Sequence, residues 1–255
     1  MEKDKLEKVI KNLIEVFFNA GKLSIDLRNK GLTKHIKKDN TPVTNGDIEV
    51  NNLILESLKK ITPNIPVVSE ETADNKNSDL NTFWLVDPID GTYDYVNNRD
   101  EFTLNAGFIL NNKAHAGIIY APAKERLFYT FGNNFSYEIC NNKEIILNNK
   151  KIDKSYIKAV CYSNNLKPEI KEIHKQYNVR EYVKMKSSLK FCVIASGEYQ
   201  IYVAEPRAYE WDIAAGHAIL KNSNGMITDI HGNTILYGKK HFKNPGIIVK
   251  TLKDL

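Results

Sequence analysis

Near the N-terminus, apolar residues recur with the spacing of an amphipathic helix. Intervals of three and four positions place seven of them on one helical face: Leu6, Val9, Ile10, Leu13, Ile14, Phe17 and Phe18. A polar loop is expected over residues 34–45. A second helical pattern begins near Asp47 and ends at Pro63 and Pro66, because proline cannot continue a helix. The chain therefore opens with two predicted helices.

Short runs that favour strands dominate the middle of the chain. Turns rich in Asn, Gly and Lys separate them, and they lie at 67–68, 83–86, 103–110, 116–121, 127–131 and 135–139. Closely spaced strands joined by hairpins indicate a largely antiparallel sheet. We expect the two N-terminal helices to flank this sheet.

The last hundred residues alternate between helix and strand patterns. Strands are expected at 159–162, 201–204 and 246–250, and helices at 167–176, 187–196 and 212–221. A polar stretch over 141–154 separates this part from the first. We therefore predict an N-terminal α+β domain over 1–150 with an antiparallel sheet, and a smaller α/β domain over 151–255.

Composition places the chain among ordinary globular proteins. Of its 255 residues 42% are hydrophobic and 26% are charged, which excludes disordered, collagenous and coiled-coil classes. No apolar run approaches the ~18 residues of a membrane span, and the polar start has no apolar signal core. The three cysteines form no CxxC pair, which indicates a reducing compartment. We expect a cytoplasmic protein and leave open a peripheral place at the cytoplasmic face of the inner membrane.

The formal net charge of +5 raises the question of an anionic partner. Lys and Arg are scattered along the sequence and form no basic face with interleaved aromatic residues. A nucleic-acid-binding module is therefore disfavoured.

The strongest chemical signal is an apolar strand that runs into the string Asp-Pro-x-Asp-Gly-Thr at 87–92. The proline cannot donate to a strand ladder and the glycine tolerates positive φ, so a sharp turn is expected at the strand end. Such a turn places Asp87 and Asp90 side by side and leaves the Ile89 carbonyl pointing outward. Two carboxylates and a carbonyl are the hard oxygen ligands that Mg²⁺ prefers. An Asp-Gly pair alone usually marks only a turn. The whole string after an apolar strand is rarely explained by a turn without further function.

Two further acidic positions strengthen the metal hypothesis. Glu70 and Glu71 follow a short apolar strand, and Asp212 begins a run of small residues that allows close helix packing. Taken singly, the glutamates fit a solvated surface and Asp212 fits a helix N-cap. Two carboxylates about 4 Å apart repel by ~4 kcal/mol at an effective dielectric of ~20. A converging cluster of four would therefore require bound cations.

Four blocks of the chain resemble the inositol monophosphatase superfamily of Mg²⁺-dependent, lithium-sensitive phosphatases. They lie in order at 42–47, 69–71, 87–92 and 211–216. The chain is most similar to the bacterial 3′(2′),5′-bisphosphate nucleotidase branch, through strings at 101–105, 120–122, 187–192 and 244–246. The resemblance implies a layered α-β-α-β-α fold.

Two positions depart from the pattern of that branch. Lys186 stands where glycine usually precedes Ser-Ser-Leu-Lys, and Gly46 stands where a small Ala or Thr usually precedes the aspartate. Neither position is an implied metal ligand. The two departures therefore bear on which substrate is preferred more than on the metal-dependent hydrolysis itself.

The resemblance also implies a set of metal ligands. Glu70, Asp87 and the Ile89 carbonyl would hold a first Mg²⁺, and Asp87, Asp90 and Asp212 a second. A third ion would lie more loosely by Glu70, so two to three ions are expected. Two metals about 3.5–4 Å apart can stabilise the attacking and the leaving oxygen of an in-line displacement.

The implied catalytic residues are Asp47, Thr92 and Glu70, of which Thr92 and Asp47 would orient and deprotonate the attacking water. Lys190 fits a nucleotide contact and a solvated helix lysine equally well, whereas packing is the simpler explanation of His217 and of the thiol of Cys192. The candidate substrate contacts are Gly91, Thr92, Ser188, Lys190, Arg207 and Asp212.

The function implied is Mg²⁺-dependent removal of the 3′-phosphate from adenosine 3′,5′-bisphosphate, giving AMP and phosphate. An inositol monophosphatase or related sugar-phosphate phosphatase is the alternative. A catalytically silent phosphonucleotide or metal sensor is disfavoured, because a pure binder needs no water-activating pair such as Asp47 and Thr92. The expected partner is a small nucleotide bisphosphate, with no nucleic acid and no transmembrane segment, and the chain as monomer or homodimer.

Overall fold

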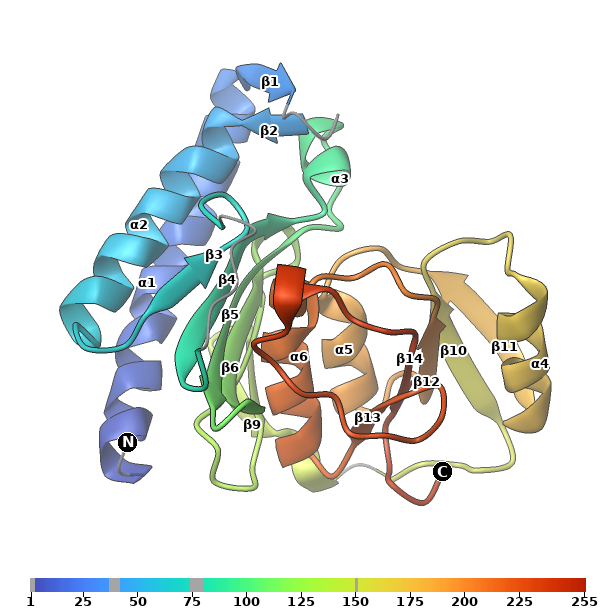
Figure 1. Cartoon of the computed structure of the whole chain (residues 1–255). Helices are drawn as coiled ribbons and strands as arrows, with labels where there is room; N and C mark the ends of the chain where they lie inside the picture. The colour runs from blue at the N-terminus through green and yellow to red at the C-terminus, as the bar shows by residue number, and fades with distance from the viewer. Residues whose placement is uncertain (1–2, 37–41, 74–79, 150) are drawn as a thin grey trace.

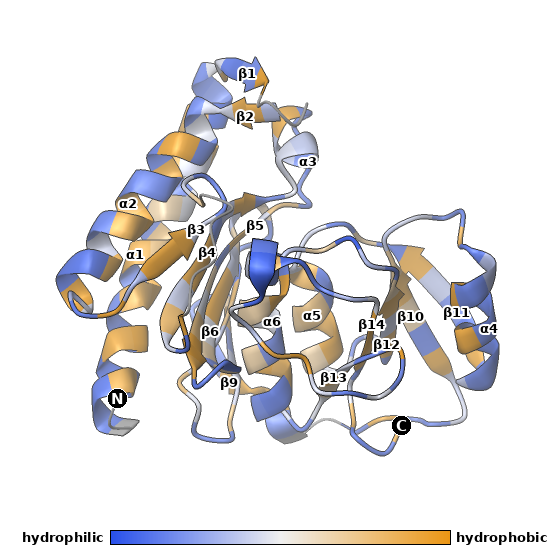
Figure 2. Ribbon diagram, viewed as in Figure 1, coloured by the Kyte–Doolittle hydropathy of each residue, from blue (hydrophilic) through white to orange (hydrophobic). Residues whose placement is uncertain are grey.

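The computed structural model describes residues 3–36, 42–73, 80–149 and 151–255. Within these ranges five layers follow one another across the molecule, helix, sheet, helix, sheet, helix (Figure 1). Helices α1 (Lys3–Lys30) and α2 (Asn45–Ile61) form the first layer. Their apolar faces lie against the first sheet (Figure 2). The predicted layered fold and its pair of N-terminal helices are confirmed.

In the described part of the chain the first sheet has seven strands, in the order β3-β4-β5-β6-β7-β8-β9. Only the pair β3–β4 is parallel, and the other described pairs are antiparallel, as predicted. The strands are β3 (Val67–Ser69), β4 (Phe83–Asp90), β5 (Thr103–Leu110), β6 (Lys113–Ala121), β7 (Arg126–Thr130), β8 (Tyr137–Cys140) and β9 (Lys143–Ile146). A short helix, α3 (Thr92–Val96), connects β4 toward β5.

The second sheet has five strands in the order β11-β10-β12-β14-β13. They are β10 (Ile157–Cys161), β11 (Val179–Lys184), β12 (Ile201–Ala204), β13 (Met226–Asp229) and β14 (Ile247–Lys250). Helices α5 (Leu189–Ala195) and α6 (Glu210–Asn222) lie between the two sheets, and α4 (Pro168–Gln176) covers the outer face (Figure 1). Short 3₁₀ helices occur at Pro122–Lys124, Leu147–Asn149 and Lys240–Phe242.

The largest hydrophobic cluster contains residues from both predicted domains. Phe83 and Phe128 of the first sheet belong to it together with Phe191 of α5, Ala214 of α6 and Val249 of the second sheet. The two sheets therefore share a core through α5 and α6. Whether 1–150 and 151–255 are separate folding units stays a prediction, and Lys150 at that boundary lies outside the described residues.

Five described strands lie where the sequence predicts none. In the predicted polar loop, Lys34–Ile36 (β1) and Pro42–Thr44 (β2) form an antiparallel ladder, and residues 37–41 lie outside the described part of the chain. Strands β9, β11 and β13 occupy stretches without a predicted strand. The first two are short edge strands with mostly exposed side chains, so they lack the apolar alternation of a half-buried strand.

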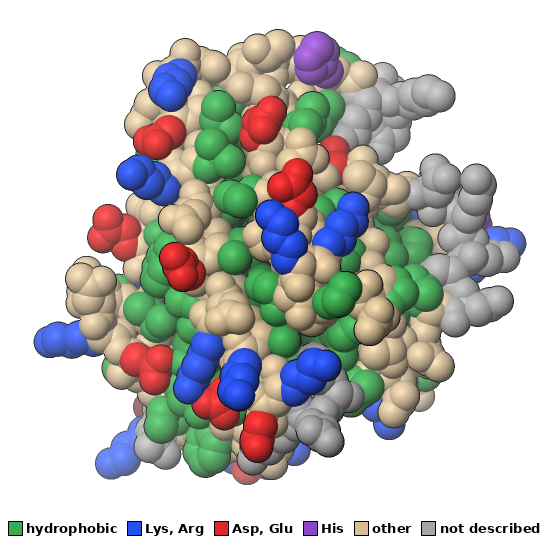
Figure 3. All heavy atoms as spheres, turned by 90° about the vertical axis from the view of Figure 1, so that its left-hand side faces the viewer, with side chains coloured by type: hydrophobic (Ala, Val, Ile, Leu, Met, Phe, Trp, Pro, Cys, Tyr) green, Lys and Arg blue, Asp and Glu red, His purple; other side chains and the backbone are tan. Residues whose placement is uncertain are grey.

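The outer face of α1 and α2 carries charges of both signs. Figure 3 shows Lys and Arg interspersed with Asp and Glu on this side, with no continuous basic area. No helix in the described ranges is long and apolar enough to span a bilayer.

Candidate active site

The centre of the site is the end of β4, where a bulge turns two carboxylates to one face. Asp87 pairs with Asn105 and Asp90 pairs with Thr103, so three steps along β4 match two steps along β5. Because alternate residues of a strand share a face, the extra residue lets Asp87 and Asp90 point the same way. Gly91 then turns the chain with φ of 93°, and a Cβ there would lie 2.7 Å from the Glu101 carbonyl oxygen. Only glycine fits this turn.

Two other elements bring carboxylates to the same place. Strand β3 runs parallel to β4 with Ser69 opposite Val86, and the Glu70 N–H donates to the Val86 carbonyl at 3.0 Å. Glu70 thus leaves its strand beside Asp87. From the other half of the chain, α6 presents Asp212 in its first turn. One carboxylate oxygen from each of Glu70, Asp87 and Asp212 lies within 4.8 Å of the others, so the predicted convergence is present for these three.

Glu70, Asp87 and Asp212 form an acidic group in which burial and mutual repulsion raise the pKa of Asp87 and of Asp212. Asp87 is 1% exposed, and its pKa is raised well above the usual range by burial and then by the charges of Glu70 and Asp90. Burial, Asp90 and Glu70 raise the pKa of Asp212 in the same way. Asp87 Oδ1 is buried and has no hydrogen-bond partner among the described residues. Hard, mutually repelling oxygens with one left unpaired fit a divalent cation such as Mg²⁺.

Asp90 lies beside the acidic group and is held from the second half of the chain. Its Oδ2 accepts hydrogen bonds from the backbone N–H and the hydroxyl of Ser188. The same hydroxyl lies 2.8 Å from the Asp212 carbonyl oxygen and 3.3 Å from Asn105 Nδ2. Ser188 therefore ties the end of β4 to α6, and its predicted contact with substrate stays a prediction.

The predicted water-activating pair is assembled at the start of α2. The Thr92 hydroxyl lies 3.1 Å from Asp47 Oδ1 and 3.1 Å from the Ile89 carbonyl oxygen. Asp47 Oδ2 accepts from the Thr44 N–H at 2.8 Å and from the Thr44 hydroxyl at 2.6 Å, which completes a capping box. Burial raises the pKa of Asp47, although the hydrogen bonds from Thr44 and Thr92 oppose that rise.

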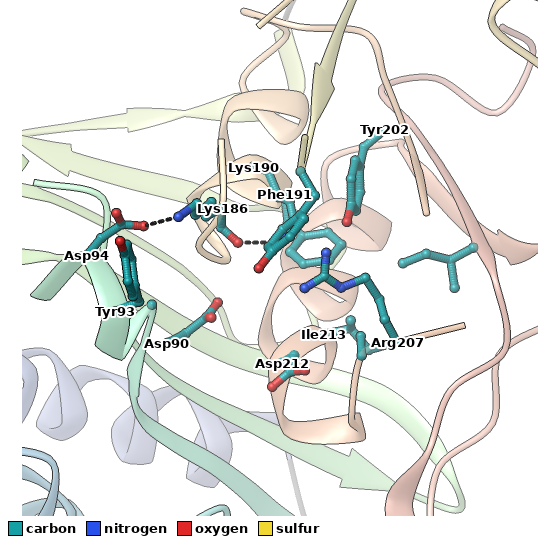
Figure 4. Close-up of a pocket in the computed structure, with 14 residues that line it drawn as sticks. Asp90, Tyr93, Asp94, Lys186, Lys190, Phe191, Tyr202, Arg207, Asp212 and Ile213 are labelled. Atoms are coloured by element: carbon teal, nitrogen blue, oxygen red, sulfur yellow. Dashed lines mark hydrogen bonds and ion pairs between the residues drawn. The ribbon is translucent and has the colours of Figure 1, made fainter. Parts of the chain in front are cut away.

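A pocket of 430 Å³ borders the acidic group at Asp212, between the two halves of the chain. Asp90 and Asp212 lie on one side of it, and Lys186, Lys190 and Arg207 bring positive charge to its walls (Figure 4). Its full lining is Asp90, Gly91, Tyr93, Asp94, Tyr162, Lys186, Lys190, Phe191, Tyr202, Arg207, Ala208, Asp212, Ile213 and Ile247.

The two predicted cationic contacts differ in their surroundings. Lys190 is buried, and its Nζ donates to the backbone carbonyls of Lys186 and Ser187 at 2.8 Å each. Burial lowers the pKa of Lys190, so this side chain is not a solvated helix lysine. Arg207 is exposed, and its guanidinium carbon lies 3.1 Å from the ring centroid of Tyr162. Its flat stacking leaves the N–H edge available to a ligand.

Several pocket residues had no motif that predicted them. Tyr162 follows β10, Tyr202 lies in β12, and Tyr93 with Asp94 begins α3. They meet only because parallel strands β10 and β12 end together near the Gly91 turn, a long-range arrangement with no local sequence pattern. Elsewhere, His217 packs with Tyr237 and Cys192 is a fully buried thiol, as predicted.

Comparison with known proteins gives three consistent relatives. The sequence matches the inositol monophosphatase family along residues 5–255. The 3′(2′),5′-bisphosphate nucleotidase CysQ of Salmonella typhimurium is 34% identical, over 84% of this chain and 87% of that protein. The protein of the same name from Buchnera aphidicola is 32% identical, over 96% and 94%. The crystal structure of CysQ from Bacteroides thetaiotaomicron matches with a TM-score of 0.77 and 26% identity, over 96% and 97%.

Proposed function

Because the chain belongs to the inositol monophosphatase family, we propose that it is a Mg²⁺-dependent 3′(2′),5′-bisphosphate nucleotidase. The substrate is adenosine 3′,5′-bisphosphate, and the products are AMP and phosphate. The observation that carries this proposal is the acidic group of Glu70, Asp87 and Asp212, of which Asp87 is buried, beside a pocket with cationic walls. The similarity to nucleotidases named CysQ supports the choice of substrate.

In this proposal two to three Mg²⁺ ions are held by the end of β4 and its neighbours. Glu70, Asp87 and the Ile89 carbonyl hold the first, Asp87, Asp90 and Asp212 hold the second, and Glu70 holds a looser third. When bound, Mg²⁺ supplies Lewis-acid stabilisation of the phosphoryl oxygens and lowers the pKa of water. Ser188 keeps the Asp90 carboxylate oriented through its two hydrogen bonds.

The attacking water is oriented by Thr92 and Asp47. When the Thr92 hydroxyl donates to Asp47, its oxygen lone pairs accept from the water, and the released proton moves toward the aspartate. Burial raises the pKa of Asp47 and so makes it a stronger base than a solvated aspartate. Thr44 fixes the second oxygen of the same carboxylate, which prevents the base from rotating away.

Substrate contacts are assigned to both walls of the pocket. The N–H groups of Gly91 and Thr92 meet the phosphoryl group at the turn after β4. Arg207, stacked on Tyr162, contacts the nucleotide from the opposite wall. Ser188, Lys190 and Asp212 complete the set of proposed contacts. A cytoplasmic location agrees with the cysteine usage.

A specificity assay tests the proposed function. Purified protein with Mg²⁺ is expected to release phosphate faster from adenosine 3′,5′-bisphosphate than from inositol 1-phosphate. Asp90→Asn is expected to abolish turnover, and Asp26→Asn, an exposed aspartate on α1, serves as the matched control. No release at any Mg²⁺ concentration would overturn the proposal. A preference for inositol phosphate would replace the substrate, and an active Asp90→Asn variant would refute the ligand assignment.

A further inference from the structure

Lys186 projects from the second half of the chain to the first half and lines the pocket. It lies in the loop between β11 and α5, and its side chain is 19% exposed. Its Nζ lies 3.5 Å from Asp94 Oδ2 and 4.6 Å from the ring centroid of Tyr93 (Figure 4). Both partners belong to α3, immediately after the Gly91 turn. The ammonium is therefore held at the edge of the pocket, over the end of β4.

The main chain of Lys186 is anchored to the acidic site. Ser188, two residues further on, binds Asp90 with its N–H and its hydroxyl. Two residues of extended chain span about 7 Å, so the Lys186 backbone stays within that distance of this anchor. Lys190 Nζ donates to the Lys186 carbonyl at 2.8 Å and fixes the loop from the other side. The position of the ammonium is thus set relative to Asp90.

The Lys186 ammonium has more donors available to a ligand than the Lys190 ammonium. Two of the three donors of the Lys190 ammonium are used by backbone carbonyls in a buried setting. The Lys186 ammonium has one ion pair, at 3.5 Å, with Asp94. Arg99 Nη1 also contacts Asp94, at 3.1 Å from Oδ1. Lys186 can therefore turn to a ligand while the buried Asp94 carboxylate keeps a cationic partner.

We propose that Lys186 binds the second, non-scissile phosphate of the substrate and makes the enzyme prefer bisphosphates to monophosphates. The inference rests on the proposed function, in which the acidic group and its cations receive the scissile phosphate. The outer phosphate then remains in the pocket that Asp90 and Asp212 border, where Lys186 in the wall offers a charge-assisted hydrogen bond. Adenosine 3′-monophosphate has no such group, so Lys186 stays on Asp94 and contributes nothing to its binding.

The test compares two substrates in two charge-removing variants. Lys186→Met keeps the aliphatic stem and removes the charge, and Lys184→Met does the same at an exposed position of β11 outside the pocket. Lys186→Met is expected to raise KM for adenosine 3′,5′-bisphosphate by about tenfold or more, with kcat little changed. Its KM for adenosine 3′-monophosphate should not change, and Lys184→Met should alter neither value. Lys186→Arg should restore most of the preference for the bisphosphate.

Ligand binding separates this inference from the proposed function. AMP retains the 5′-phosphate, so Lys186→Met should weaken AMP binding by about tenfold and leave adenosine binding unchanged, as measured by calorimetry with Mg²⁺. Wild-type protein that hydrolyses neither nucleotide refutes the proposed function, and the AMP-to-adenosine comparison still decides the role of Lys186. If Lys186→Met raised KM equally for both substrates, Lys186 would serve only as a structural bridge to Asp94. That result, or an unchanged KM for adenosine 3′,5′-bisphosphate, would overturn the inference.

Discussion

At position 46 the structure leaves no room for a side chain. A Cβ there would lie 2.4 Å from the hydroxyl oxygen of Tyr95 and 2.7 Å from its Cε1 atom. Tyr95 is fully buried, and its hydroxyl donates to the Ser24 carbonyl at 2.6 Å. The tyrosine therefore occupies the space that a side chain at position 46 would need. This contact explains the departure at Gly46, which lies directly before the catalytic candidate Asp47.

Gly46→Ala is expected to destabilise the protein because of Tyr95. Overpacking of this kind costs about 1–3 kcal/mol, which outweighs the gain of about 1 kcal/mol that alanine usually brings to a helix. Tyr95→Phe removes the nearest atom, so the same glycine substitution should cost less in that background. Urea unfolding of the two single variants and the double variant measures the coupling. An equal cost in both backgrounds would contradict the proposed clash.

His217 should make stability depend on pH. Burial, with Lys221 and Lys239 nearby, lowers its pKa to about 3, and its Nδ1 lies 2.9 Å from the Tyr237 hydroxyl. In the unfolded chain the pKa is about 6.5, so the unfolded state binds more protons at intermediate pH. The stabilisation is therefore fully present above about pH 6.5 and is lost as pH falls toward 3, by up to about 1.4 kcal/mol per pH unit.

The pH effect is measured as the free energy of unfolding at pH 7 and pH 4.5. His217→Gln cannot gain the proton, so it should lose less stability over this interval than the wild type. His231→Gln, at an exposed histidine, should follow the wild type. Identical slopes for the His217 variant and the wild type would show that His217 does not contribute.

At the scale of elements, the site could be predicted as far as its parts are local in sequence. The strand before Asp87, the turn at Gly91 and the helix that carries Asp212 each have a local pattern, and all three are present. The bulge between Asp87 and Asp90 depends on the register with β5, which no local pattern specifies. The same limit applies to the anchoring of Asp90 by Ser188, since Asp90 ends β4 of the first sheet and Ser188 caps α5 in the second half of the chain.

Helix α6 can reach the site because the first sheet carries glycine beneath it. A Cβ at Gly107 would lie 2.6 Å from Ala214 Cβ and 2.7 Å from the Ala215 nitrogen. At Gly117 a Cβ would lie 2.8 Å from Ala215 Cα. The small residues of α6 suggested close packing, but only the structure shows that glycines of β5 and β6 face them. This contact sets the distance between Asp212 and the end of β4.

Gly107→Ala should therefore weaken metal binding as well as stability. Displacing α6 moves Asp212 away from Asp87, so the Mg²⁺ concentration for half-maximal activity should rise, and overpacking should cost about 1–3 kcal/mol. Val9→Ala, in the core under α1, should lower stability by a similar amount and leave the Mg²⁺ requirement unchanged. An unchanged Mg²⁺ requirement in Gly107→Ala would show that α6 adjusts without moving Asp212.

For the whole molecule, the charge of the chain and the charge of the site have opposite signs. The formal net charge is +5, and the α1–α2 face mixes both signs (Figure 3). The acidic group of Glu70, Asp87 and Asp212, with Asp90 beside it, is by contrast locally negative. An anionic substrate is repelled there until cations are bound, so bulk charge says little about which partner the site accepts.

The acidic group should reduce the stability of the metal-free protein, and Asp87→Asn tests this directly. Removing one buried charge should stabilise the metal-free protein by about 1–4 kcal/mol at neutral pH. Because the folded-state pKa of Asp87 is raised, this gain should disappear as pH falls toward the unfolded value of about 3.9. The wild type should gain about 2.7 kcal/mol at Mg²⁺ a hundredfold above its Kd, and Asp87→Asn far less.

Thermal unfolding with EDTA and with Mg²⁺, at pH 7 and pH 4.5, measures both effects on the same samples. Asp26→Asn changes the net charge equally at an exposed position of α1, so it should respond to Mg²⁺ as the wild type does. A less stable metal-free Asp87→Asn would mean that the carboxylate is compensated within the fold. A full Mg²⁺ response in that variant would mean that Asp87 does not hold the cation. We expect instead that Asp87→Asn is more stable than the wild type without metal and responds little to Mg²⁺. The two effects go together, because the repulsion that destabilises the metal-free fold is also what makes the site bind a divalent ion.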